Sequence, residues 1–311
     1  MQNTIVEEII KLAEQYPEIS MLTADLGTNI GIRAFEQRFP QRYFNMGIAE
    51  QNLMSVAAGM ALSGGIPFVA TFACYASMRA CEQVRTSIAY QNVKVRIIAS
   101  HSGLSVGENG ASHQCLEDIS IMRAIPNMVI LSPAGIDEVK EMITQTMYIN
   151  GPIYIRLPRV HESFSVNSKK EIAIGKAIIV KEGRDITLVS TGYMLSRALN
   201  AAKILENEGV SVQVMHIGTI KPFDKTAIKM AAIATRIMIT IEDHSIIGGL
   251  FSAVAEVIAE NAINCIVKPI GVNDVFAESG NYLQLIEKYE IGAKSIAKKA
   301  IELIGGARIE N

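Results

Sequence analysis

The chain has 311 residues, of which 49% are hydrophobic and 19% charged, and its formal net charge is −2. This length predicts two domains, and the composition is that of a well-buried globular protein. The lysines and arginines are scattered, so no basic patch indicates binding to nucleic acid or to an anionic membrane. The chain shows no basic n-region before an apolar stretch and no run of about 18 apolar residues, so we expect neither a signal peptide nor a membrane span.

Four cysteines, Cys74, Cys81, Cys115 and Cys265, are spread along the chain. They form neither a CxxC pair nor the spacing of a disulfide framework. We therefore expect them to pack in the core rather than to bind a metal. Such cysteine usage is typical of a reduced cytoplasmic protein.

Short β-rich runs alternate with helical patterns through the first half of the chain. The expected strands are Ile19–Thr23, Pro67–Thr71, Val95–Ser100, Val129–Ser132 and Ile153–Leu157, and the expected helices are 2–15, 49–62, 74–90, 117–123 and 135–148. This alternation predicts a mostly parallel sheet with helices on both faces. Its ligands should lie at the carboxyl ends of the strands.

A polar stretch, 161–171, is expected to link a first domain at 1–160 to a second domain at 172–311. The second half repeats the α/β alternation. Its expected strands are Ile186–Ser190, Val210–Met215, Ile237–Ile241 and Cys265–Ile270, and its expected helices are Leu195–Glu208, Gly248–Ala259 and Gly292–Leu303. The predicted fold class is therefore α/β, with two doubly wound domains.

The most informative segment places Glu50 in the first turn of a helix made of small and apolar residues. Apolar positions recur at helical spacing as far as Ala61, and Gly64-Gly65 ends the run. A carboxyl group beside that apolar stripe is partly desolvated, which favours its protonated form and suits a group that shares or donates a proton. The alternative is a solvated first-turn acid that only interacts with the helix dipole.

A glycine-rich segment, His101–Gln114, directly follows the strand expected at 95–100. Its three glycines let the backbone turn sharply and approach a ligand closely. His101 and His113 bracket the segment, which indicates a functional loop, although a surface loop with incidental polar residues is the alternative. A zinc site fits less well, because no cysteine or third histidine stands nearby in ligand spacing.

Two further pairs stand at or near the ends of expected strands. Phe72 and Tyr75, at i and i+3, can form one wall of a pocket for a flat ring, unless they are ordinary core aromatics. Arg156 and Arg159 stand near the carboxyl end of the last strand in the first half. An arginine there can bind a phosphate or carboxylate through two N–H groups, and the alternative is a surface or interface ion pair.

Taken in order, these motifs resemble the C-terminal half of transketolases and of deoxyxylulose-phosphate synthases. The resemblance rests on Ala24-Asp25-Leu26, Gly47-Ile-Ala-Glu50-Gln51, Thr71-Phe72, His101…Gly107-Glu-Asn-Gly110…His113-Gln114, Gly151-Pro152…Arg159 and Glu242-Asp-His-Ser-Ile-Ile-Gly-Gly249. It covers essentially the whole chain. Residues 1–160 resemble the pyrimidine-binding domain of thiamine-diphosphate enzymes, and residues 172–311 resemble their C-terminal domain, which implies a smaller, mixed sheet there.

The resemblance implies a role for each matching residue. Glu50 corresponds to the glutamate that hydrogen-bonds the cofactor's aminopyrimidine and so promotes formation of the reactive ylid. His113 and His101 correspond to the other catalytic positions. Further cofactor-binding positions correspond to Asp25, Phe72 and Tyr75.

Positions that contact the sugar phosphate correspond to Thr28, His101, Asn109, Arg156 and Arg159. The family usually has an aspartate where this chain has Asn109, and that acid contacts a hydroxyl group of the substrate. The resemblance therefore leaves the sugar preference of this chain open.

The resemblance also implies a cofactor and a partner. Enzymes of this kind hold thiamine diphosphate through Mg²⁺ on a Gly-Asp-Gly motif, which this chain does not contain. An N-terminal transketolase subunit is therefore expected to supply the Mg²⁺ and diphosphate ligands, in an α₂β₂ assembly.

The activity implied by the resemblance is transfer of a two-carbon ketol unit between sugar phosphates by a split transketolase. Another thiamine-diphosphate transferase subunit is the enzymatic alternative, either similar to deoxyxylulose-phosphate synthase or, less well matched, the β subunit of a 2-oxo-acid dehydrogenase. A catalytically silent assembly subunit is the non-enzymatic alternative.

Overall fold

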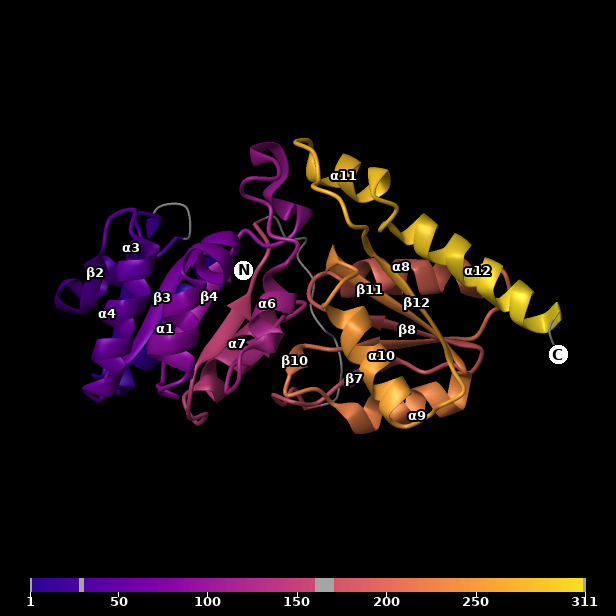
Figure 1. Cartoon of the computed structure of the whole chain (residues 1–311), viewed down its shortest axis with the longest axis horizontal. Helices are drawn as coiled ribbons and strands as arrows, with labels where there is room; N and C mark the ends of the chain where they lie inside the picture. The colour runs from indigo at the N-terminus through magenta and orange to yellow at the C-terminus, as the bar shows by residue number, and fades with distance from the viewer. Residues whose placement is uncertain (1, 28–30, 160–170, 310–311) are drawn as a thin grey trace.

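The computed structural model describes residues 2–27, 31–159 and 171–309, which form two sheets covered by helices (Figure 1). The larger sheet has seven strands in the order β10-β5-β6-β4-β3-β1-β2. They are β1 (Ile19–Thr23), β2 (Tyr43–Asn45), β3 (Ile66–Phe72), β4 (Arg96–Ser100), β5 (Val129–Leu131), β6 (Ile153–Arg156) and β10 (Thr219–Lys221). All pair in parallel except β10, which pairs antiparallel with β5. The carboxyl ends of the six parallel strands therefore meet at one edge of the sheet.

Helices cover both faces of this sheet, and as a result β1 and β4 are buried at every residue. The helices are α1 (Gln2–Gln15), α3 (Arg33–Arg38), α4 (Glu50–Leu62), α5 (Cys81–Gln83), α6 (Asp118–Ala124) and α7 (Ile136–Thr146). Helix α4 buries Leu53, Met54 and Ala57, as its apolar spacing predicts. It ends just before Gly64, whose φ of 93° lies in the left-handed region that favours glycine.

The segment expected as one helix at 74–90 is broken into wider turns. The π-helical turns η2 (Tyr75–Arg79) and η3 (Val84–Ala89) flank the short α5. Apolar spacing does not distinguish a π turn from an α turn over so few residues, and π turns occur often at functional sites. Because η2 follows β3 almost directly, it places Tyr75 and Arg79 at the carboxyl edge of the sheet.

The second sheet has five strands in the order β12-β11-β8-β9-β7. The strands are β7 (Ile178–Lys181), β8 (Ile186–Ser190), β9 (Val212–His216), β11 (Ile237–Ser245) and β12 (Ile266–Val272), and the helices are α8 (Met194–Asn207), α9 (Lys225–Thr235), α10 (Leu250–Glu260), α11 (Tyr282–Lys288) and α12 (Ala293–Ile309). Strand β7 is antiparallel to β9, and the other pairs are parallel. The expected smaller, mixed sheet is thus confirmed.

Several elements were not expected from the sequence, namely α3, β2, β7, β10, α9 and α11. The expected linker at 161–171 falls almost wholly outside the described residues, since 160–170 are not among them, and Thr28 is outside them as well. Within the described ranges, no helix is both long and apolar enough to cross a membrane.

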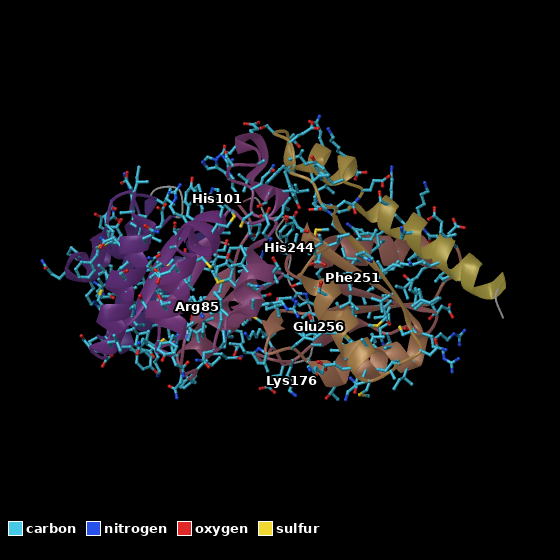
Figure 2. The ribbon with its side chains drawn as sticks, in the orientation of Figure 1. Arg85, His101, Lys176, His244, Phe251 and Glu256 are labelled. Carbon is cyan, nitrogen blue, oxygen red and sulfur yellow. The ribbon has the colours of Figure 1, made fainter. Side chains whose placement is uncertain are left out.

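The two domains are joined by backbone pairing as well as by side chains. Strand β10 belongs to the second half of the chain but extends the first sheet (Figure 1). Lys221 Nζ donates to the carbonyl oxygens of Arg123 and Ile125, at 2.9 and 2.6 Å. At the end of β11, His244 lies where the domains meet (Figure 2), and the next N–H, that of Ser245, donates to Leu116 O at 2.8 Å. The C-terminal domain therefore lies against the edge at which ligands are expected.

Candidate active site

A cavity of about 370 Å³ opens where β1, β3 and β4 end. It is lined by Ala24, Asp25, Leu26, Ile48, Glu50, Phe72, Tyr75, His101, Asn109, His113 and Arg159. All the site residues proposed from the sequence line this cavity except Thr28, which lies outside the described residues, and Arg156. Segments far apart in the sequence thus converge because parallel strands present their carboxyl ends together.

Glu50 lies in the cavity wall at the start of α4 and is 1% exposed. Arg79 Nη1 donates to its Oε2 at 2.8 Å, and the guanidinium also lies over the Tyr75 ring, 4.0 Å from the centroid. Sequence reasoning missed Arg79, although its i+4 position relative to Tyr75 is a recognised spacing for side-chain pairs. Glu50 is thus a buried carboxylate that is paired with the Arg79 guanidinium.

Aromatic rings form one side of the cavity. Phe72 stacks on Tyr75 with centroids 5.6 Å apart and on His101 at 3.9 Å. His113 lies edge-on to Phe72 at 6.4 Å and to Tyr75 at 6.0 Å. These rings make a rigid apolar surface with two imidazoles at its border, which suits a flat heterocycle and a polar reacting group next to it.

His101 directly follows β4, has a left-handed φ of 57° and is 5% exposed. Its Nδ1 is 3.0 Å from Ser100 Oγ, so one ring nitrogen is engaged by the neighbouring hydroxyl. Burial lowers the pKa of His101 to about 4, and the positive charges of Arg159 and His113 act in the same direction. A neutral imidazole can exchange hydrogen bonds with substrate hydroxyls without adding charge to the cavity.

We expect His101 to stay neutral from pH 8 down to about 5, because its pKa in the fold is about 4, below the ordinary 6.5. Between those two values the unfolded chain binds the proton more tightly, so His101 reduces folding stability as pH falls through that window. NMR titration of the histidine ring protons, assigned with His101→Gln, measures this directly. A His101 resonance that titrates at or above 6.5 contradicts the expectation.

Asp25 is held in place by a residue that the sequence analysis did not select. The Asn45 side chain accepts from the Asp25 N–H at 2.9 Å and donates to Asp25 Oδ1 at 3.1 Å. The same side chain accepts from the Gly47 N–H at 3.0 Å. Asn45 therefore couples the loops after β1 and β2, one carrying Asp25 and the other leading to Glu50.

At the opposite side of the cavity, Asn109 and Arg159 are both exposed. Arg159 Nη1 donates to Val106 O at 2.9 Å, and the Arg159 N–H donates to Ser105 Oγ at 2.8 Å. Arg159 also lines a second cavity, of about 390 Å³, which lies between residues 105–108 and the start of α11. A cation at this position can attract the phosphate of a sugar phosphate.

The structure does not bring Arg156 to the cavity. Its Nε donates to both Asp118 oxygens, at 3.0 and 2.9 Å, and its Nη2 donates to Asp243 O at 2.8 Å. The side chains of Arg156 and Asp118 are 3% and 0% exposed. Arg156 is still within β6, where successive side chains point to opposite faces of the sheet. Its guanidinium is directed into the domain contact, where Nε and Nη2 donate to Asp118 and to Asp243 O.

The donor set fits the pyrimidine end of thiamine diphosphate, since a buried carboxylate, Glu50, stands beside the stacked rings of Phe72 and Tyr75. Among the described residues, no group of three or more His, Cys, Asp or Glu side chains is placed to hold a metal ion. The described side chains therefore match the ring of this cofactor and not its diphosphate.

Comparison with known proteins identifies the two domains. Residues 1–161 match the family model of the transketolase pyrimidine-binding domain, and residues 175–296 match that of the transketolase C-terminal domain. The fold is thus that of the pyrimidine-binding and C-terminal domains of this enzyme class. The chain belongs to the transketolase family.

Two of the relatives have about the same length as this chain, and a third is about twice as long. A Methanocaldococcus jannaschii protein, provisionally named a transketolase C-terminal section, is 43% identical over 95% of this chain and 93% of its own length. A 6-deoxy-6-sulfo-D-fructose transketolase subunit of Clostridium sp. is 37% identical over 97% of this chain and 94% of its own. A 1-deoxy-D-xylulose-5-phosphate synthase of Dictyoglomus turgidum is 34% identical over 97% of this chain but 49% of its own.

Among solved structures, a split-gene transketolase described as an inactive β4 tetramer superimposes with a TM-score of 0.88. It is 41% identical to this chain, and 97% of each chain is covered.

Proposed function

We propose that this chain is one subunit of a heteromeric transketolase that moves a two-carbon ketol unit from a ketose phosphate to an aldose phosphate. The observation that carries this proposal is the cavity itself. Buried Glu50 and the Phe72–Tyr75 pair line this cavity, the two histidines pack against that pair, and Arg159 lines the same cavity. This is a ring-binding site next to a polar site that suits a sugar phosphate.

Thiamine diphosphate, when bound, would supply the nucleophilic carbon and the electron sink that ketol transfer requires. Glu50 would hold a proton at the pyrimidine nitrogen that faces its carboxylate, while Phe72 and Tyr75 pack on the ring and exclude water. His113 borders both the aromatic wall and the open cavity, so it can move a proton to or from the substrate carbonyl. His101 and Asn109 would orient the substrate hydroxyls, and Arg159 would bind the phosphate.

An exposed apolar side chain at the cavity supports the need for a partner. Ile48 lines the cavity and is 77% exposed. A large apolar side chain that is exposed beside a cavity is typical of a surface covered by another chain. In this proposal the partner is an N-terminal transketolase subunit that carries the Gly-Asp-Gly motif and Mg²⁺, in an α₂β₂ assembly.

Calorimetric titration with thiamine diphosphate and Mg²⁺ tests the proposal. The isolated chain should bind the cofactor weakly or not at all, because it lacks the charge-assisted contacts to the diphosphate. Binding should appear when the N-terminal subunit from the same source is added, together with ketol transfer from xylulose 5-phosphate to an aldose phosphate. Tight, Mg²⁺-dependent binding to the isolated chain would contradict the proposal.

The 34% identity to a deoxyxylulose-phosphate synthase favours a second candidate, a transferase subunit that makes a 1-deoxy sugar phosphate. A product screen of the reconstituted complex distinguishes the two. A 1-deoxy product with no ketol transfer would select the second candidate, and cofactor binding with no product of either kind would indicate an assembly subunit.

A further inference from the structure

The substrate side of the cavity is built on a loop whose position depends on the C-terminal domain. This loop, Gly103–Gly110, contains the 3₁₀ segment η4 (Leu104–Asn109) and carries Asn109. It also holds Arg159, through Ser105 Oγ and Val106 O. In Figure 1 the loop stands at the top of the view beside α11, which belongs to the second domain.

Asp243, in β11 of the C-terminal domain, anchors the start of this loop. The Leu104 N–H donates to both carboxylate oxygens of Asp243, at 3.0 Å each. The first backbone N–H of η4 is thus satisfied by a side chain from the other domain, much as a capping residue satisfies the first turn of a helix.

The loop backbone at Gly103 approaches Asp243 too closely for any side chain at that position. Gly103 has a φ of 62°, and a Cβ there would overlap the Asp243 carboxylate. The far end of the loop is held in a similar way, because a Cβ at Gly110 would overlap Ser279 Oγ and because Gln114 Nε2 donates to Glu278 O at 3.0 Å. The C-terminal domain therefore contacts both ends of the segment that carries Asn109.

Asp243 is 1% exposed, and ionisable groups of both domains lie near it. Arg156 binds its backbone carbonyl, Asp118 pairs with Arg156, and His244 Nε2 lies 4.0 Å from Asp118. Burial raises the pKa of Asp243 to about 6, and Arg156 and the Leu104 N–H oppose that rise. Above that pH the group is an anion, and ionised acceptors form roughly twice as strong a hydrogen bond as neutral ones.

We propose that Asp243 is a positioning residue, through which the C-terminal domain fixes the position of the loop that carries Asn109 and supports Arg159. The position of this loop in turn determines the affinity of the complex for sugar phosphate. Asp243 is not among the residues that line the cavity, so it acts through the loop and not on the substrate itself. The identity of the ligand rests on the proposed function, whereas the anchoring of the loop does not.

Asp243→Asn tests the proposal in two independent ways. Amide hydrogen exchange of the full-length chain, followed over 103–110, should become roughly 10-fold faster, because the charge-assisted acceptor of the Leu104 N–H has become neutral. In the reconstituted complex, KM for the sugar phosphate should rise about 10-fold, with a smaller fall in kcat. The affinity for thiamine diphosphate should not change, since Glu50, Phe72 and Tyr75 lie on other elements.

Glu242→Gln is the matched control. Glu242 is the preceding residue, is equally buried, and also accepts from backbone N–H groups, those of Leu250 and Phe251 at the start of α10. It does not contact the loop, so loop exchange and KM should stay at wild-type values.

Equal effects of the two substitutions, or unchanged exchange over 103–110 in Asp243→Asn, would overturn the proposal. If Asp243→Asn does not fold, Gly103→Ala replaces it as the test variant, because the added methyl group displaces the loop while the Asp243 carboxylate remains. Wild-type KM and wild-type exchange over 103–110 in Gly103→Ala would overturn the proposal too. If the reconstituted wild-type complex shows no ketol transfer but loop exchange is faster in Asp243→Asn, the proposed function is refuted. The anchoring role of Asp243 is then still supported.

Discussion

Glu50→Gln is expected to lower kcat of the reconstituted complex on the order of 10²-fold or more, the range typical of a lost acid–base group. Glutamine has nearly the same shape as glutamate, so the helix start and the fold should be preserved. The amide cannot hold a proton at the cofactor's pyrimidine as a carboxylate does. Exchange of the cofactor C2 proton in deuterated buffer reports on this role directly, and it should slow by a similar factor.

A matched control separates catalysis from helix stability. Glu36 is also a first-turn acid, at the start of α3, but it is exposed and is not among the residues that line the cavity. Glu36→Gln should therefore leave kcat and C2 exchange unchanged. If Glu50→Gln behaves in the same way, Glu50 is only a helix-start acid and the proposed function loses its main support.

Sequence patterns predicted the central part of the fold because its strands are long, apolar and buried on both sides. Strand β1 was expected at Ile19–Thr23 and lies there, and β8 likewise matches Ile186–Ser190. Most of the elements that were missed have only 3 to 7 residues, although α9, with 11 residues, was missed as well. Strand β10 has three residues and hydrogen-bonds to the sheet of the other half, a long-range pairing that local periodicity does not encode.

The residues of the candidate site were predictable where they follow strands. His101 comes directly after β4, and Phe72 is the last residue of β3, so topology brings both to one edge. Partners that come from elsewhere were not predictable in this way. Arg79 reaches Glu50 across 29 residues and Asp243 reaches Leu104 across 139, and only the folded chain shows these contacts.

Arg156 shows how the same reasoning can fail. The sequence places two arginines near one strand end, and either could bind a phosphate. The structure distinguishes them by exposure and by partner, since Arg159 is exposed at the cavity, whereas Arg156 is buried against Asp118. Spacing along a strand specifies the face on which a side chain lies, but not which charged group another helix places opposite it.

Arg156→Met is therefore expected to lower the free energy of unfolding of the chain by about 3–5 kcal/mol, the cost typical of removing one partner of a buried ion pair. Among the described residues, the substitution leaves the Asp118 carboxylate with only the Tyr154 hydroxyl, at 2.9 Å, as a side-chain hydrogen-bond donor. It also removes the donor to Asp243 O. Urea denaturation of the full chain measures the effect as a lower midpoint at an unchanged slope.

Arg159→Met is the matched variant, and the two arginines should behave in opposite ways. Because Arg159 is exposed, its loss should change the free energy of unfolding by about 0.5 kcal/mol or less, while KM for the sugar phosphate rises on the order of 10-fold or more. Adding Asp118→Asn to Arg156→Met should restore part of the lost stability, since the unpaired buried charge is then removed. If Arg156→Met instead keeps wild-type stability and raises KM as much as Arg159→Met does, Arg156 binds substrate, as the sequence alone predicted, and its pairing with Asp118 does not stabilise the fold.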